Sequence, residues 1–331
     1  MKIAVLQFNP NLGAFAYNVS HADYLLSSNQ TNLDLLVLPE MAFSGYNFPN
    51  LEAIRPFLEP TAQGPTTQWA IKTATQRQCT VVVGYPEIAT ETAADGSSAT
   101  KNYNSTVFVG PNGAVLANYR KSFLYYTDET WAAEGFRSTP EQKPFFAAPI
   151  PSLLPHGGNV GHGICMDINP YQFQSDWRHY EFASTMLQAN CKLVLLSMAW
   201  LTRLTPEACA AEPERPDMET VAYWLERFWP FVDRQPAEAA VVVFANRCGS
   251  EGKAVGAVRM PEHGEEIEIG DRVAYAGSSC VMRFQGGSVK LWEHFVGKKK
   301  GDVGLLGKGE EGFLVVDTGM PAGFLLQQKT G

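Results

Sequence analysis

The sequence predicts an α/β fold, a four-layer α-β-β-α sandwich with an internal pseudo-two-fold repeat. Short apolar runs alternate with helical segments, and the same order of elements occurs twice along the chain. Each occurrence ends in a β-hairpin with a glycine-containing turn. Continuous apolar runs are typical of strands that are covered on both faces. Two such halves can bury their sheets against each other and carry helices on the outer faces.

The first half opens with a β-type run at residues 2–8, which ends at the breaker pair Asn9-Pro10. Its hairpin turns at residues 110–113, with the sequence Gly-Pro-Asn-Gly. The elements of this half are expected as strands at 2–8, 33–40 and 80–86, a helix at 66–77, and a hairpin pairing 103–109 with 114–119. The polar stretch 89–101 is expected to be a surface loop.

The second half repeats this order after a proline-rich stretch at residues 142–155, which is expected to be the surface loop joining the halves. Its elements are expected as strands at 160–166, 192–198 and 239–246, helices at 180–190 and 218–232, a hairpin pairing 278–284 with 288–292, and a last strand at 313–317. Residues 206–216 suggest an insertion at a pocket mouth. We expect one domain over residues 1–331, with halves at about 1–150 and 156–320.

Composition limits the classes of function. The chain has 331 residues, 45% of them hydrophobic, and a net charge of −8, so it can bury a large core and is not a disordered protein. Its lysines and arginines are scattered, which argues against nucleic acid or an anionic membrane as a partner. The sequence shows no long apolar span, no secretory signal and no paired cysteine spacing. We therefore expect reduced thiols and a cytoplasmic location.

Three residues with suitable chemistry stand at the ends of predicted strands. Glu40 follows an apolar strand and precedes apolar and aromatic residues, so burial would raise its pKa and make it a usable base. Lys121 follows the first hairpin, and Cys165 follows a glycine-rich strand. Taken singly, each has a structural explanation: a solvated strand end, a lysine that reaches to water, or a small core residue. Their combination favours nucleophilic catalysis by a cysteine.

The motifs resemble those of the nitrilase superfamily of carbon-nitrogen hydrolases. They are Leu-Pro-Glu at residues 38–40, Arg-Lys-x-Phe-Leu at 120–124 and Gly-x-Cys-Met-Asp at 163–167. The resemblance covers nearly the whole chain and implies a nitrilase-like sandwich. It also implies Glu40 as general base, Lys121 as stabiliser of the tetrahedral intermediate, Cys165 as nucleophile and the backbone N–H of Met166 as an oxyanion donor. No metal or organic cofactor is implied.

Within this superfamily, two longer strings are similar to those of the fungal protein N-terminal amidases. These are Leu-Pro-Glu-Met-Ala-Phe-Ser-Gly-Tyr at residues 38–46 and Cys-Met-Asp-Ile-Asn-Pro-Tyr-Gln-Phe at residues 165–173. The resemblance implies conversion of an N-terminal Asn or Gln into Asp or Glu, with release of ammonia, in the N-degron pathway. The implied partners are peptides or proteins that begin with Asn or Gln. Because the chain is shorter than some of these proteins, its peripheral substrate-binding segments are expected to differ.

Such a substrate carries a free α-ammonium, so the pocket should contain a carboxylate that pairs with it. By position, the carboxylates that qualify are Asp167, Asp128, Glu129 and Glu134. Many family members have a second glutamate between the lysine and the cysteine, and Glu129 is the favoured counterpart here. Trp131 and Tyr125 are expected as pocket walls, although aromatic residues more often pack in the core. Asp167 has an alternative explanation, because an acid after a turn often binds backbone N–H groups.

Other interpretations stay open. The same three residues suit an ω-amidase or carbamoylase that acts on a free small molecule. His263-Gly264-Glu265 offers the His-x-Glu pair of a glutaminase triad, but it lies in an acidic stretch. An inactive scaffold with this fold is a third alternative. His162 is expected to be structural, because a residue three positions before Cys165 in a strand points to the opposite face. Association into a homo-oligomer is not determined by the sequence.

Overall fold

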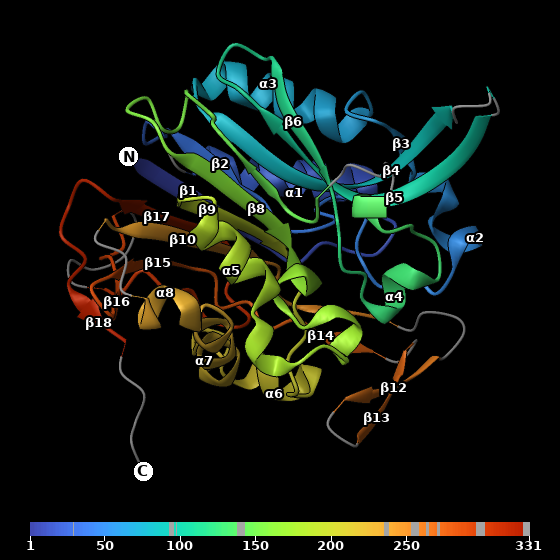
Figure 1. The fold of residues 1–331 in the computed structure, drawn as a ribbon. Helices are drawn as coiled ribbons and strands as arrows, with labels where there is room; N and C mark the ends of the chain where they lie inside the picture. Colours follow the sequence, from blue (N-terminus) through green and yellow to red (C-terminus); the bar gives the residue numbers. More distant parts are fainter. Residues whose placement is uncertain are drawn as a thin grey trace.

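The computed structural model describes residues 1–28, 30–92, 96, 98–137, 143–234, 238–252, 258–262, 265–269, 272–295 and 302–326. Two β-sheets lie face to face, and helices cover the outer face of each (Figure 1). This arrangement confirms the predicted four-layer α-β-β-α sandwich. In the part of the chain described, no helix is both long and apolar enough to cross a membrane.

The first sheet has the order β17-β1-β2-β4-β5-β6, with the short β3 beside β4. Its strands are β1 (Lys2–Gln7), β2 (Leu35–Val37), β3 (Glu59–Pro60), β4 (Thr80–Thr92), β5 (Ser98–Val109), β6 (Val115–Arg120) and β17 (Gly312–Asp317). β17, which was expected to complete the second half, instead pairs antiparallel with β1. The C-terminal part of the chain therefore closes the edge of the first sheet.

The second sheet has the order β18-β16-β15-β10-β9-β8-β7. Its strands are β7 (Phe146–Ala148), β8 (Asn159–Ile164), β9 (Cys191–Met198), β10 (Ala240–Asn246), β15 (Cys280–Gln285), β16 (Ser288–Leu291) and β18 (Phe324–Leu325). Three parallel strands followed by an antiparallel hairpin occur in each sheet, as β1-β2-β4-β5-β6 and as β8-β9-β10-β15-β16. This is the repeat that the sequence predicted. Two small two-stranded sheets lie outside both large sheets: β11 (Ser250–Glu251) with β14 (Val273–Ala274), and β12 (Val258–Glu262) with β13 (Glu265–Ile269).

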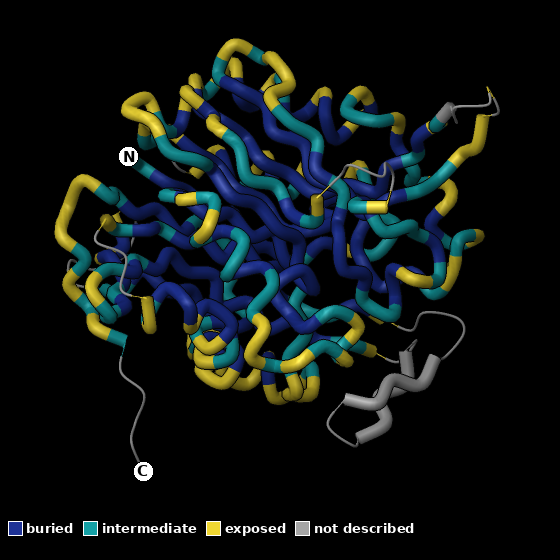
Figure 2. The backbone as a smooth tube through the Cα atoms, in the orientation of Figure 1, coloured by how far each residue is buried: buried dark blue, intermediate teal, exposed yellow. Residues whose placement is uncertain are grey.

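The helices form the outer layers and the rim. They are α1 (Phe15–Ser27), α2 (Leu51–Ile54), α3 (Pro65–Arg77), α4 (Tyr126–Glu129), α5 (Glu181–Gln188), α6 (Pro206–Ala211), α7 (Met218–Arg227) and α8 (Trp229–Asp233). α1 and α3 pack on the first sheet, whereas α5, α7 and α8 pack on the second. The side chains of Val5, Val37, Val82, Leu195 and Val243 meet between the sheets with no solvent exposure. Figure 2 shows that the backbone at the centre of the molecule is largely buried. This dry interior is why the strands are apolar on both faces.

The structure corrects three predicted elements. The loop expected at 89–101 is largely strand, because β4 and β5 extend to Thr92 and from Ser98 as a polar hairpin. The expected linker 142–155 contains β7, which forms the edge of the second sheet. The single helix expected at 218–232 is two helices, α7 and α8, because Pro230 lacks the backbone N–H that a continuous helix needs.

Candidate active site

Glu40 is placed by the turn that follows β2. Met41, the next residue, has a positive φ of 49°, which bends the chain sharply away from the strand. Gly84 in β4 passes close beside this turn, and a Cβ on it would lie 2.7 Å from the Cα of Glu40 and 2.6 Å from the backbone nitrogen of Met41. Only glycine allows this approach, so β4 packs directly against the turn and fixes the carboxylate of Glu40.

Lys121 is placed by the end of β6. Its backbone N–H donates to the carbonyl of Asn104 at 2.8 Å, and its carbonyl accepts from the N–H of Gly135 at 2.8 Å. The preceding residue, Arg120, turns to the other side and pairs with the buried Glu87 at 2.7 Å. The backbone on both sides of Lys121 is therefore held, and its side chain points into the protein.

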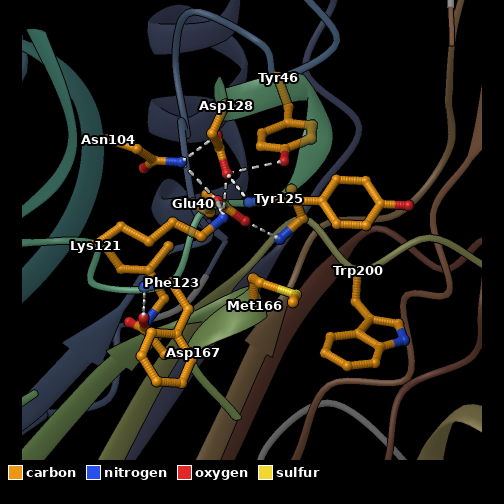
Figure 3. Close-up of polar contacts among 12 residues, drawn as sticks. Glu40, Tyr46, Asn104, Lys121, Phe123, Tyr125, Asp128, Met166, Asp167 and Trp200 are labelled. Atoms are coloured by element: carbon orange, nitrogen blue, oxygen red, sulfur yellow. Dashed lines mark hydrogen bonds and ion pairs between the residues drawn. The ribbon is translucent and has the colours of Figure 1, made fainter. Parts of the chain in front are cut away.

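The Lys121 ammonium lies between two carboxylates. Its Nζ is 2.6 Å from Oε1 of Glu40 and 2.6 Å from Oδ2 of Asp128. Figure 3 shows the lysine side chain reaching both acids. The side-chain nitrogen of Asn104 donates to the same two acids, at 2.7 Å to Glu40 and 3.0 Å to Asp128. All four residues have no solvent exposure. We call Glu40, Asn104, Lys121 and Asp128 the buried charge cluster.

Asp128 lies on the one-turn helix α4 and is surrounded by donors. Besides Lys121 and Asn104, the backbone N–H of Tyr125 donates to it at 3.0 Å and the hydroxyl of Tyr46 at 3.3 Å. Three of these four bonds go to Oδ2 and one goes to Oδ1. Asp128 has no solvent exposure and is already paired with Lys121, which corrects its prediction as the acid that pairs with an incoming ammonium.

The pKa shifts follow from burial and pairing. Burial raises the pKa of Glu40 above its ordinary value, and Lys121 offsets part of that effect. Burial alone would lower the pKa of Lys121, but Asp128 and Glu40 outweigh it and raise that pKa. Burial and then Glu40 raise the pKa of the Cys165 thiol, against the opposing effect of Lys121. The resting site therefore holds a charged lysine and a neutral thiol, and Cys165 needs a base to become a nucleophile.

Cys165 stands where β8 ends and a 3-10 turn (Cys165–Ile168) begins, not inside a longer strand as predicted. Its φ is 43°, an uncommon value for a residue with a side chain and one often found at functional sites. The backbone N–H of Ala199, the residue after β9, donates to Glu40 at 2.8 Å and also acts to lower the pKa of the Cys165 thiol. The end of β9 thus joins the thiol to the buried charge cluster.

A cleft of about 440 Å³ opens beside Cys165, and we call it the Cys165 cleft. Met166 and Tyr125 line it next to the thiol, and Trp200 and Tyr223 continue the aromatic wall. Pro206 of α6 contributes to its rim, as expected for the inserted segment. Its lining also includes the acids Asp217 and Glu219, which the motif analysis did not select.

Asp167 does not face the cleft. Its Oδ1 accepts from the backbone N–H groups of Ser122 and Phe123, and its Oδ2 accepts from the hydroxyl of Tyr119 and the N–H of Ile164, at 2.7–3.0 Å. The residue has no solvent exposure. Its prediction as a substrate ligand is wrong, and the alternative given for it, binding of turn backbone, is confirmed. Asp167 ties the chain after Lys121 to the end of β8.

Three more of the predicted binding residues, Glu129, Glu134 and Trp131, also lie outside the Cys165 cleft. Glu129 is exposed and lines a neighbouring cavity of about 300 Å³. Burial raises its pKa moderately, with further contributions from Asp128 and Glu134. Glu134 accepts from the hydroxyl of Tyr171 and pairs with Arg137. Trp131 packs in a buried cluster of apolar residues. Of the six residues offered for substrate binding, Tyr125 alone is found on the cleft wall in the part of the chain described.

The acid beside the lysine is Asp128 and not the favoured Glu129. Both follow the same two tyrosines, and the sequence does not show which of two adjacent acids turns inward. Asn104 was missed as well. It lies in β5, and polar residues in the buried end of a strand are the signal that could have pointed to it. The structure does bring Glu40, Lys121 and Cys165 together, but their catalytic roles remain predictions.

His162 is structural, as predicted. Its Nε2 lies 2.6 Å from the hydroxyl of Thr106 on the opposite sheet, and burial lowers its pKa to about 3. His263 lies outside the described residues. Within the described ranges, no group of three or more His, Cys, Asp or Glu side chains is arranged to hold a metal ion.

Comparisons with known proteins identify the family of this chain. The family model of carbon-nitrogen hydrolases matches residues 2–173. A protein N-terminal amidase of Schizosaccharomyces pombe is 32% identical over 307 residues, which cover 88% of this chain and 94% of that relative. The Saccharomyces cerevisiae protein N-terminal amidase is 32% identical over 216 residues, 61% of this chain and 45% of that relative.

Solved structures agree on the fold. A crystal structure of an N-terminal amidase superposes with a TM-score of 0.69 and 22% identity over 96% of this chain and 97% of its own. Structures of N-terminal amidase were also solved with Gln-Val and Asn-Glu peptides. The chain therefore belongs to the carbon-nitrogen hydrolases of the nitrilase superfamily and resembles the fungal protein N-terminal amidases.

Proposed function

We propose that the protein is a cysteine amidohydrolase that converts N-terminal Asn, and also Gln, of peptides or proteins into Asp or Glu with release of ammonia. The observation that carries this proposal is the placement of Cys165 between the buried charge cluster and an open cleft. The relatives named protein N-terminal amidases support the choice of substrate. The reaction places the protein in the N-degron pathway, with proteins that begin with Asn or Gln as its partners.

Glu40 acts as the base in the first step. It accepts three hydrogen bonds from described residues, from Lys121, Asn104 and Ala199. Because a carboxylate offers about four lone-pair positions, one remains for the thiol proton of Cys165. The sulfur then attacks the side-chain amide carbon, and the carbonyl electron pair moves to the oxygen.

Lys121 and the backbone N–H of Met166 stabilise the resulting oxyanion. The charged ammonium is already fixed by two carboxylates, so little reorganisation is needed when negative charge develops. The 3-10 turn begins at Cys165, which leaves the N–H of Met166 without a partner inside the turn. Glu40 returns its proton to the leaving nitrogen, ammonia departs, and a thioester to Cys165 remains.

Water hydrolyses the thioester in the second step. Glu40 takes a proton from the water, the hydroxide adds to the thioester carbon, and the tetrahedral intermediate expels the thiolate. The thiolate regains its proton and the new carboxylic acid leaves. This chemistry requires a reduced Cys165. All six cysteines are free thiols, which suits the cytoplasm, where we place the protein.

Ammonia release from four substrates tests the proposal. They are a peptide beginning with Asn, one beginning with Gln, the Asn peptide with an acetylated N-terminus, and free glutamine. Each is measured with the wild type, with Cys165→Ala and with Cys191→Ala, a buried thiol of β9 that does not line the cleft. We expect turnover of the two unblocked peptides by the wild type and by Cys191→Ala. Cys165→Ala should lose at least about 10⁴-fold in kcat with an unchanged melting temperature.

Other outcomes separate the alternatives. Turnover of free glutamine without turnover of peptides would replace the proposal with a small-molecule ω-amidase. Turnover of none of the four would favour a carbamoylase or an inactive scaffold. If Cys165→Ala keeps its activity, Cys165 is not the nucleophile.

A further inference from the structure

An N-terminal substrate brings a positive charge into the cleft. Its α-ammonium lies close to the reacting amide carbon, and in Gln it lies one bond farther away than in Asn. A buried ammonium without a partner would cost several kcal/mol, so an enzyme for such substrates needs a carboxylate on the cleft wall. The acids that the sequence suggested do not supply it. Asp128 is buried and already paired with Lys121, and both oxygens of Asp167 accept two hydrogen bonds each. Glu129 and Glu134 lie outside the cleft.

Asp217 is a carboxylate on the wall of the cleft that Cys165 also lines. It precedes α7, lines the Cys165 cleft and is 9% exposed. The other charged residues of the described lining, Arg203, Glu219 and Arg272, are all exposed at its rim. Asp217 is therefore the carboxylate that a substrate would meet inside the cleft, away from bulk water.

The carboxylate of Asp217 is fixed on one side and open on the other. Its Oδ2 accepts from the hydroxyls of Thr202 at 2.7 Å and Thr220 at 2.9 Å. Its Oδ1 receives one long contact, 3.2 Å from the backbone N–H of Thr220. Thr202 and Thr220 also line the cleft, and Ser278 holds the backbone N–H of Asp217 at 2.8 Å.

Capping of α7 does not by itself explain an aspartate here. Asparagine or serine caps a helix about as well, and the long contact from Thr220 shows that the cap is not tight. The two hydroxyl donors instead orient the carboxylate so that Oδ1 keeps lone pairs free for a donor arriving in the cleft. A carboxylate held in advance costs little entropy on binding.

We propose that Asp217 binds the α-ammonium group of the substrate's N-terminal residue, with Thr202 and Thr220 holding the carboxylate in place. This inference rests on the proposed function and deepens it. It explains selection for a free N-terminus, since an acetylated or missing amine would leave the Asp217 carboxylate unpaired.

The test compares two substrates that differ only in the α-amine: an Asn-Glu-Ala peptide and its succinamyl analogue, in which hydrogen replaces the amine. The quantity measured is the ratio of their kcat/KM values for ammonia release. In Asp217→Asn we expect kcat/KM for the Asn peptide to fall about 10²-fold or more, chiefly through KM, and the ratio to approach one. The melting temperature should change little, because Asn caps helices as well as Asp does.

Glu129→Gln is the matched control, because it removes the same charge from the neighbouring cavity and should keep the wild-type ratio. Asp217→Ser, another good helix cap, repeats the test if Asp217→Asn does not fold. A folded Asp217 variant that keeps the wild-type ratio of the two kcat/KM values overturns the inference. A ratio that falls towards one in Glu129→Gln but not in the Asp217 variants also overturns it. Both of these leave the proposed function standing if the wild type hydrolyses the Asn peptide. A wild type that does not hydrolyse it removes the function and the inference together.

Discussion

Two parts of the candidate active site, one from each half of the chain, hold their acidic side chains in opposite ways. The first half supplies Glu40 and Asp128, which have no solvent exposure and share the ammonium of Lys121. The second half supplies Asp217, which lies on the wall of an open cleft and is held by hydroxyls. Under the proposed function, the comparison teaches that the carboxylates of the chemistry are buried together with their own cation, whereas the carboxylate that recognises the substrate keeps an acceptor position free for one.

The two environments also respond differently to substitution. In a low-dielectric interior, charges interact strongly and an unpaired one is costly. A change in the buried charge cluster should therefore affect catalysis, stability or both. A change on the cleft wall should affect substrate affinity and leave the fold intact.

Glu40→Gln should produce the largest effect in the first half. Glutamine keeps the size of the side chain but cannot take the proton of Cys165, so we expect kcat to fall about 10²- to 10⁴-fold. The measurement is the rate of ammonia release from the Asn peptide at saturating substrate. A rate close to that of the wild type would show that Glu40 is not the base. It would also contradict the claim that the buried charge cluster serves the chemistry whereas the cleft wall serves substrate binding.

Lys121→Ala should reduce both activity and stability. It leaves Glu40 and Asp128 buried side by side without their cation, and we expect the free energy of unfolding to fall by about 3–5 kcal/mol. Urea unfolding measures this change. Lys101→Ala, which removes an exposed partner of Glu91, is the control and should cost less than about 1 kcal/mol. Wild-type stability in Lys121→Ala would show that the cluster is not an interdependent unit.

Glu59→Gln should have the smallest effect, confined to stability and its pH dependence. Burial raises the pKa of Glu59 to about 7, and its described partner is Thr66 rather than a cation. The folded state then binds more protons than the unfolded state between the ordinary pKa and about pH 7. Its contribution to the free energy of unfolding should therefore fall as pH rises through this range, by on the order of 2–3 kcal/mol.

Urea unfolding of the wild type and Glu59→Gln between pH 4.5 and pH 7.5 measures this difference, with kcat as the control. The variant should lack the decline that the wild type shows. Equal pH profiles would mean that Glu59 titrates normally, and that burial without a cation does not suffice to perturb a carboxylate in this fold.

Glu40, Lys121 and Cys165 could be selected from the sequence because each follows or ends a strand with a recognisable motif. Glu40, Lys121 and Cys165 are far apart in the chain, and the parallel strands and the hairpin bring them to one end of the sandwich. The sealed surroundings of Glu40 could also be anticipated, because its flanking residues are apolar and aromatic. The fold could likewise be predicted, because the same order of strands and helices occurs twice in the sequence.

The cleft wall could not be predicted in this way. Asp217 lies in a stretch rich in acids and prolines, without a motif, and its partner Thr202 comes from a different loop. The choice between Asp128 and Glu129 depends on the register of a single helical turn. The polar ends of β4 and β5 have the composition of a loop, because a hairpin that extends into solvent needs no apolar face.

The most direct test of the account is the intact mass of the protein quenched with acid during turnover of an Asn-Glu-Ala peptide. The account predicts a covalent adduct of the peptide mass less that of ammonia, which fragmentation places on Cys165 and which Cys165→Ala does not form. An adduct on a different residue, or an adduct that still forms in Cys165→Ala, would contradict the thioester mechanism. It would also contradict the separate roles proposed for the buried charge cluster and for Asp217.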